Sequence, residues 1–150
     1  DLDIKAVMIH GRTMSQGHAG EVNWKIIKEA RQYFKGVIIA NGGVKDYDSA
    51  QALLEKSGAD GVGIGQGVMG RPWVFEQLRI MNYELRIMEV FKLAIKHARL
   101  AYRLKGKQGI AEMRKHLCWY VAGLPNAGEL RRELVKAKSL KEIEKILKKG

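Results

Sequence analysis

Three short apolar segments, each followed by a polar loop and then by a helical pattern, constrain the fold of this chain more than any other feature. The segments are Ala6–Ile9, Val37–Ala40 and Val62–Ile64. Runs of this length fit buried strands, and the patterns between them fit amphipathic helices. Regular alternation of strand and helix predicts consecutive right-handed units with parallel strands. We therefore expect an α/β fold, built from three parallel βα units, in the first part of the chain.

The helices between these strands have clear predicted ends. Asn23 is the expected N-cap of the first helix, because its side chain can accept a hydrogen bond from an unpaired helical N–H group. Either Asp46 or Asp48 starts the second helix. Gly58 is its expected end, because glycine readily adopts the left-handed conformation that closes a helix.

The polar loops that follow the three strands form the predicted site. They are His10–Thr13, Asn41–Val44 and Gly65–Arg71. Parallel strands end at the same edge of a sheet, and ligands of α/β folds bind outside this carboxyl edge. We expect the three loops to meet around one ligand.

The glycine-rich loop after the third strand has the properties of an anion site. The glycines of Gly65–Gly70 leave main-chain N–H groups uncovered, and Pro72 suits the first turn of a following helix. We predict a phosphate cradle here. The G-x-G-x-x-G spacing of this loop does not predict a dinucleotide fold, because the sequence after Trp73 has a helical pattern and no strand follows.

From about Glu84 onward the spacing of apolar residues is helical. We expect a break near Gly106 and the end of a second helix at Gly123. Asn126 and Ser139 are the expected N-caps of two further helices. Helices joined by short links predict a small all-α bundle.

The net charge of +11 is concentrated in this helical part. Residues 1–83 hold 10 Lys and Arg against 9 Asp and Glu, whereas residues 84–150 hold 17 against 7. Such an asymmetry indicates a polyanionic partner, of which nucleic acid is the main example. A solvated basic surface that aids solubility is the alternative.

Other features of the composition narrow the function classes. The single cysteine, Cys118, excludes an internal disulfide and fits a reducing cytoplasm; its place within a helical pattern predicts a packed thiol. No apolar run reaches about 18 residues, so a membrane span is not expected. His18, His97 and His116 lack the spacing of metal ligands, so no metal site is expected.

Four motifs along the chain form a recognisable set. They are I-H-G-R-T at Ile9–Thr13, N-G-G-V at Asn41–Val44, a segment ending in G-R-P-W-V-F at Gly65–Phe75, and R-K-H-L-C-W-Y at Arg114–Tyr120. Together they resemble the C-terminal half of the tRNA-dihydrouridine synthases, which depend on FMN. The resemblance extends over essentially the whole chain. It implies the last three units of a TIM-type (β/α)8 barrel in residues 1–83 and a helical tRNA-binding domain in residues 84–150.

The resemblance also implies roles for individual residues. Contacts to FMN are implied for His10, for the backbone of Asn41, Gly42 and Gly43, and for Gly65 and Gln66 at the phosphate. Contacts to tRNA are implied for Arg12, Arg114, Lys115, Arg131 and Arg132, with a solvated basic face as the alternative. NADPH would be the reductant of the full enzyme.

Two departures from the family pattern modify these expectations. Gln66 stands where the family usually has an arginine, so the loop keeps a hydrogen-bonding group but loses a charge that can grip phosphate. The family's proton-donating cysteine, in an N-x-G-C-P segment, and its flavin-contacting lysine belong to the first half of the barrel. Neither segment occurs in this sequence.

We therefore expect a fragment that is inactive by itself and that associates either with a missing N-terminal barrel half or with another copy of itself. The alternative is a stand-alone basic RNA-binding module that keeps a relic of a flavin site and has no catalysis.

Overall fold

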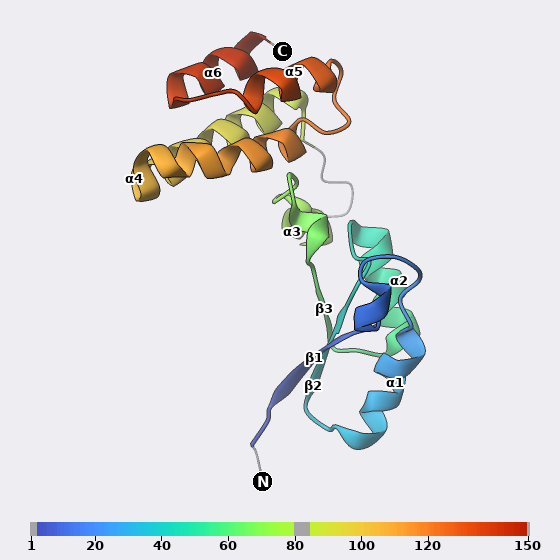
Figure 1. Ribbon diagram of the computed structural model, residues 1–150. Helices are drawn as coiled ribbons and strands as arrows, with labels where there is room; N and C mark the ends of the chain where they lie inside the picture. The colour runs from blue at the N-terminus through green and yellow to red at the C-terminus, as the bar shows by residue number, and fades with distance from the viewer. Residues whose placement is uncertain (1–2, 80–84, 150) are drawn as a thin grey trace. The chain divides into compact units, whose positions relative to one another are not determined.

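The computed structural model describes residues 3–79 and 85–149, and the chain divides into two compact units (Figure 1). One unit comprises Asp1–Val68 and Trp73–Asn82, and the other comprises Met69–Pro72 and Tyr83–Gly150. The expected boundary between residues 83 and 84 lies outside the described residues.

The first unit contains a parallel sheet. Its strands are β1 (Ala6–His10), β2 (Val37–Asn41) and β3 (Gly61–Gly63). Within the described ranges these are its only strands, in the order β1-β2-β3. Both strand pairs are parallel, as predicted.

Helices follow each strand of this sheet. They are α1 (Trp24–Tyr33), α2 (Tyr47–Ser57) and the short α3 (Val74–Arg79). Single 3₁₀ turns lie in the loops after β1 and β3, at η1 (Met14–Gln16) and η2 (Gln66–Val68). Figure 1 shows α1 and α2 on the same side of the sheet.

The hydrophobic core of this unit therefore lies on one face of the sheet. Ile38 and Ala40 of β2 are buried against Ile27 of α1 and Leu53 of α2. On the other face Met8 is 59% exposed and Val37 is 47% exposed. The prediction of fully buried strands is thus wrong for β1, whose burial alternates, and for β3, whose residues are half-buried. In the described residues the helices cover one face only, so an apolar run does not imply burial on both.

The predicted helix ends of this unit are confirmed. The side chain of Asn23 accepts a hydrogen bond from the N–H group of Lys25 at 3.1 Å. Asp46, rather than Asp48, is the N-cap of α2, where it exchanges hydrogen bonds with Ser49. Gly58 closes α2 in the left-handed conformation, with φ of 64°.

The second unit is helical. The long helix α4 (Ile87–Tyr120) is interrupted at Gly106, where φ is 57° and ψ is −136°, as the sequence predicts. Its two arms fold back on one another, since a side chain at Gly109 would lie only 2.2 Å from the carbonyl oxygen of Ala101. Two shorter helices, α5 (Ala127–Leu134) and α6 (Leu140–Lys149), pack against α4 and against each other. The most deeply buried side chains include Ala94, Ala98, Ile110, Leu117, Leu134 and Ile143.

Two predicted helix starts in this unit have different outcomes. Ser139 caps α6, because the N–H group of Glu142 donates to its hydroxyl at 3.2 Å and the hydroxyl donates to the Glu142 carboxylate at 3.0 Å. Asn126 precedes α5 but its side chain makes no capping hydrogen bond. It is nevertheless the N-cap residue, because its carbonyl oxygen accepts from the N–H groups of Glu129 at 3.0 Å and Leu130 at 3.1 Å, while its backbone is left-handed with φ of 56°.

Within the described ranges, every helix is too short or too polar to cross a lipid bilayer.

Candidate functional site

The carboxyl ends of β1 and β2 bring two predicted site residues side by side. His10 and Asn41 are partners in the register of the two strands. The N–H group of Gly11 donates to the carbonyl oxygen of Asn41 at 3.1 Å and so continues the pairing into the loop. The His10 side chain is exposed, as a ligand contact requires.

The side chain of Asn41 lies on the open face of the sheet, above β3. Its Nδ2 atom is 3.7 Å from the Met8 sulfur. Gly63 is its register partner on β3, and a Cβ atom there would lie 2.7 Å from Nδ2. Glycine at position 63 thus leaves room for the carboxamide, and no described atom lies within 4 Å of the Cβ position at Gly61. The result is half-buried backbone without side chains beside a polar amide.

The loop after β2 needs both of its glycines. Gly42 and Gly43 have φ of 126° and 72°, which other residues rarely adopt. A side chain at Gly42 would also begin 2.9 Å from Val22 and 3.6 Å from the His10 ring. The position of a Cβ at Gly43 is 3.9 Å from Nη2 of Arg12, whose Nε donates to the carbonyl of Gly20 at 3.0 Å. The loop therefore has a fixed cation at its edge.

The glycine-rich loop packs directly on this second loop. A Cβ atom at Gly67 would lie 2.3 Å from the carbonyl oxygen of Val44 and 2.9 Å from the Cα of Lys45. Gly65 and Gln66 are exposed at the start of the 3₁₀ turn η2. The structure thus brings the predicted loops after β2 and β3 together. The loop after β1 lies beside the loop after β2, through His10 and Arg12.

One detail of the predicted cradle is wrong. Pro72 does not lie in the first turn of a helix, because α3 begins at Val74 and spans only six residues. The chain passes through η2 first, so the main-chain N–H groups near Gly65 belong to a loop and a 3₁₀ turn. An anion here would be held by loop amides without a long helix dipole behind them.

The segment after the cradle belongs to the helical unit. Gly70 is buried, with φ of 74°, and a Cβ atom there would lie 2.4 Å from the carbonyl carbon of Trp119. Only glycine allows the segment to approach α4 this closely. Gly70 of the G-R-P-W-V-F motif therefore lies against Trp119 of the R-K-H-L-C-W-Y motif.

The predicted RNA-contacting residues of α4 and α5 divide into two kinds. Arg114 is half-buried and donates from Nε to the carbonyl of Ala137 at 2.8 Å, and Arg131 donates to the carbonyl of Cys118 at 3.3 Å. These arginines help to join helices. Lys115 and Arg132 are exposed, and the Lys115 ammonium lies 4.9 Å from the centre of the Trp119 ring.

A cluster that the sequence analysis missed lies between the arms of α4. The rings of His97 and His116 have centroids 5.6 Å apart, and Nδ1 of His97 lies 3.3 Å from the hydroxyl of Tyr120. Burial, and then the charge of His116, lowers the pKa of His97, whereas burial raises the pKa of Tyr120 to about 12. His97 and His116 stand nine residues before and ten after Gly106, so their symmetry about the predicted break could have revealed the pair.

Metal binding and thiol chemistry find no support at these positions. In residues 3–79 and 85–149, no cluster of three or more His, Cys, Asp or Glu side chains is arranged to hold a metal ion. Burial raises the pKa of the Cys118 thiol, and the nearby charge of Arg131 opposes this only in part. Cys118 is therefore mainly protonated at neutral pH, as expected for a packed thiol.

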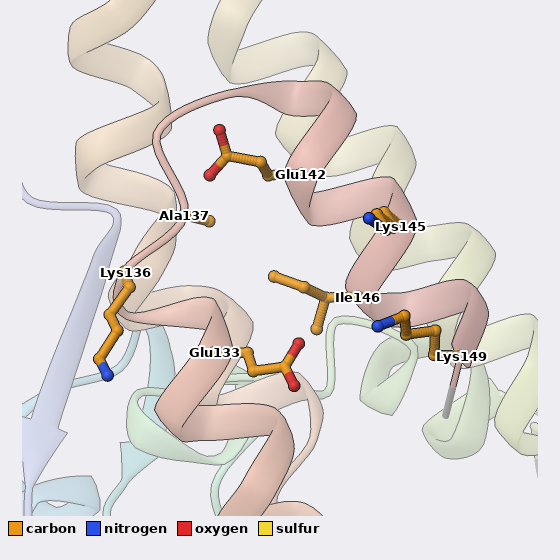
Figure 2. Close-up of a pocket in the computed structure, with 7 residues that line it drawn as sticks. All are labelled: Glu133, Lys136, Ala137, Glu142, Lys145, Ile146 and Lys149. Carbon is orange, nitrogen blue, oxygen red and sulfur yellow. The ribbon is translucent and has the colours of Figure 1, made fainter.

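A pocket of about 280 Å³ lies between α5 and α6 (Figure 2). It is lined by Glu133, Lys136, Ala137, Glu142, Lys145, Ile146 and Lys149. The backbone N–H group of Lys138 and the hydroxyl of Ser139 both donate to Glu142 and lower its pKa. Carboxylates beside the lysines oppose an anionic ligand, and we assign none to this pocket.

Comparison with known families identifies the family of the chain. The model of the dihydrouridine synthase (Dus) family matches residues 2–149. The chain belongs to the dihydrouridine synthase family. This confirms the resemblance of the four motifs to the family.

Dus relatives from several bacteria are similar to most of the chain. A probable tRNA-dihydrouridine synthase of Rickettsia typhi is 36% identical over 138 residues, which are 85% of this chain and 41% of the relative. One from Mycobacterium leprae is 33% identical over 95% of this chain and 39% of its own length. A third, probable tRNA-dihydrouridine synthase 1 of Synechocystis sp., is 32% identical over 98% and 43%. The chain thus spans about two fifths of the length of the Dus proteins it matches.

Membership of the Dus family also bears on the fold and the cofactor. Dus proteins have a TIM-type barrel, and the parallel β1-β2-β3 sheet with its helices is consistent with part of one. The family is flavin-dependent in general. The three loops fit such a cofactor, because they offer exposed loop backbone at Gly65 and Gln66 for a phosphate and the half-buried amide of Asn41 for a ring.

Proposed function

We propose that this chain is the C-terminal part of an FMN-dependent tRNA-dihydrouridine synthase, a cytoplasmic enzyme that reduces uridine in tRNA. The observation that carries the proposal is the meeting of the loops at His10, Asn41–Gly43 and Gly65–Val68 at one edge of a parallel sheet in a Dus-family chain.

Each loop has a distinct part in this proposal. The amides near Gly65 and the side chain of Gln66 hold the FMN phosphate, while Arg12 balances its charge. The Asn41 carboxamide and His10 contact the flavin ring, since both side chains end at the open face of the sheet. Bound FMN, once reduced by NADPH, would supply the hydride for the uracil ring.

The helical unit is proposed to bind the tRNA. It carries most of the excess positive charge, and phosphate contacts require such a surface. Lys115 and Arg132 are the exposed candidates, whereas Arg114 and Arg131 each use one N–H group within the protein. An arginine has five N–H donors, so these two can still reach a phosphate.

No acid for the second half of the reduction is assigned within this chain. Uracil reduction needs a proton as well as a hydride, and the only cysteine is Cys118, a protonated thiol within α4. We therefore propose that activity requires the rest of the barrel.

A flavin titration and a tRNA titration of the purified chain test the proposal. We expect quenching of FMN fluorescence on binding, and Asn41→Ala should weaken it about 2- to 13-fold, the range for one lost hydrogen bond. Gln51→Ala, an exposed change on α2, should have no effect, and tRNA binding should be the same for all three proteins.

Catalysis provides the second readout. The chain incubated with FMN, NADPH and unmodified tRNA should give no dihydrouridine above background. If the chain binds tRNA but no FMN, the function is instead that of a stand-alone RNA-binding module. Product from this chain alone would disprove the requirement for the rest of the barrel.

A further inference from the structure

A second pocket lies between the two arms of α4. Its volume is about 260 Å³. The residues that matter for its chemistry are His97, Leu100, Leu104, Lys105, Met113 and His116. This volume is below the range of about 300–1,000 Å³ typical of sites for drug-sized ligands, so it fits a single heterocycle.

The walls of this pocket suit a flat ring with polar edges. The two imidazoles, 5.6 Å apart and tilted by 50°, provide aromatic surface and hydrogen-bonding nitrogens. His97 is held in place through its contact with Tyr120. Met113 is buried beneath them, while Leu100 and Leu104 are 49% and 72% exposed at the entrance. An exposed leucine pair beside imidazoles is costly in water unless a ligand covers it.

The charge around the pocket identifies the kind of molecule that carries the ring. Helix α4 holds eight Lys and Arg against two Asp and Glu. At the rim, Lys105 is paired with Glu112 at 2.6 Å, so the pocket itself is close to neutral. A neutral, partly aromatic pocket on a basic helix is complementary to a neutral ring on an anionic backbone.

We infer that this pocket binds one unstacked nucleobase of the RNA. The inference rests on the proposed RNA-binding role and adds a base contact to it. Proteins that bind unpaired RNA stack bases on aromatic side chains, including histidine, and neutralise the phosphates nearby. In this arrangement the basic residues of α4 outside the pocket contact the phosphates, and the imidazoles contact the base.

The test compares two RNA probes, a short oligouridylate and an abasic RNA oligomer of the same length and charge. Binding of the full chain is followed by fluorescence anisotropy over a range of salt concentrations. His116→Ala should weaken oligouridylate binding by about 5- to 150-fold, the range for loss of one stacked base. Leu104→Ala should also weaken it, by removing apolar contact at the entrance. The dependence on salt should not change, because no phosphate contact is lost. Neither change should alter binding of the abasic oligomer.

Controls make the outcomes distinct. Met88→Ala changes another exposed apolar residue of α4 that does not line the pocket, and it should match the parent chain. Leu104 is mostly exposed, so its variant will fold even if His116→Ala does not. Equal losses for both oligomers, or no loss for either, overturn the base contact. Failure of the parent chain to bind tRNA would overturn the RNA-binding role as well, whereas tRNA binding that is indifferent to both pocket variants overturns the pocket alone.

The Leu104→Ala variant would also reveal whether another copy of this chain, rather than RNA, occupies the pocket. If Leu104→Ala abolishes self-association measured by sedimentation and leaves RNA binding unchanged, the pocket belongs to an interface between copies of this chain. That result would overturn the inference.

Discussion

At the scale of single residues, Gln66 sets the strength of the proposed phosphate contact. It is exposed at the start of η2, beside loop amides and without a long helix behind it. Both a glutamine and an arginine would donate to a charged phosphate, but an arginine adds a positive charge and can donate two parallel N–H groups. The chain thus has a weaker phosphate contact than an arginine would give.

Gln66→Arg should therefore strengthen FMN binding, by up to about 5-fold, the range for one exposed ion pair. The gain should shrink as salt is raised, because the new interaction is between exposed charges. Fluorescence titrations with FMN and with riboflavin measure the effect, and riboflavin serves as the control because it lacks the phosphate. An equal gain for both ligands would place the arginine away from the phosphate.

Asp60 is a second residue whose charge matters, because its carboxylate binds an N–H group of strand β2. Its carboxylate accepts hydrogen bonds from the N–H group of Ile38, at 2.8 Å, and from Arg31. These contacts, the backbone one first, hold the pKa of Asp60 below its ordinary value of 3.8. Because the folded pKa is the lower one, the contribution is complete above pH 3.8 and is lost as pH falls through the folded value.

The first unit should accordingly lose stability in acid, and Asp60→Asn should flatten that loss. Thermal melts followed by circular dichroism between neutral pH and about pH 2 measure it. Asp48→Asn, an exposed change on α2, is the matched control and should follow the parent chain. A parallel pH profile for Asp60→Asn and the parent would contradict the role of Asp60.

At the scale of elements, helix α4 shows which features a sequence can predict. The break at Gly106 and the closing residue Gly58 were predicted because both depend on local backbone preferences. The pairing of His97 with His116 was not, because it exists only after the two arms fold together. The exposure of β1 was missed for a similar reason, since an apolar run does not state how many faces are covered.

The packing of these two arms predicts different effects on stability for two glycine-to-alanine substitutions. Gly109→Ala should destabilise the helical unit by about 1–3 kcal/mol, because its Cβ would collide with the backbone of Ala101. Gly128→Ala in α5 meets no described atom within 4 Å and should be neutral or stabilise by up to about 1 kcal/mol. Chemical denaturation of both variants measures the difference. A smaller loss for Gly109→Ala than for Gly128→Ala would contradict the close approach of the arms.

At the scale of the whole molecule, the candidate site was easier to predict than its surroundings. The loops at His10, Asn41 and Gly65 were found because parallel strands end at a common edge. Their partners Gly61 and Gly63, which clear the open face beside Asn41, were not, because their role depends on the register of β3. The hydrogen bonds of Arg114 and Arg131 to the carbonyls of Ala137 and Cys118 were not predicted either, because they join residues distant in sequence.

The open face of the sheet has a consequence for association. Met8 and Val37 are exposed there, next to unpaired strand edges, and such surfaces tend to pair with another chain. We expect the chain alone to self-associate at tens of micromolar, and Met8→Glu to weaken this. Sedimentation velocity measures it, with Met14→Glu as control, since Met14 is exposed in a loop. A clean monomer of the parent chain would contradict the expectation.

The burial of Gly70 against Trp119 has a consequence for how the protein can be divided. The four residues Met69–Pro72 belong to the helical unit although the sheet unit surrounds them in sequence. A helical fragment that begins at residue 84 would lack the segment that packs on the backbone of Trp119, and should therefore be less stable than the intact unit. The two units therefore cannot be separated by dividing the sequence at a single point. A transplant of the helices onto another protein would have to carry the segment Met69–Pro72 as well.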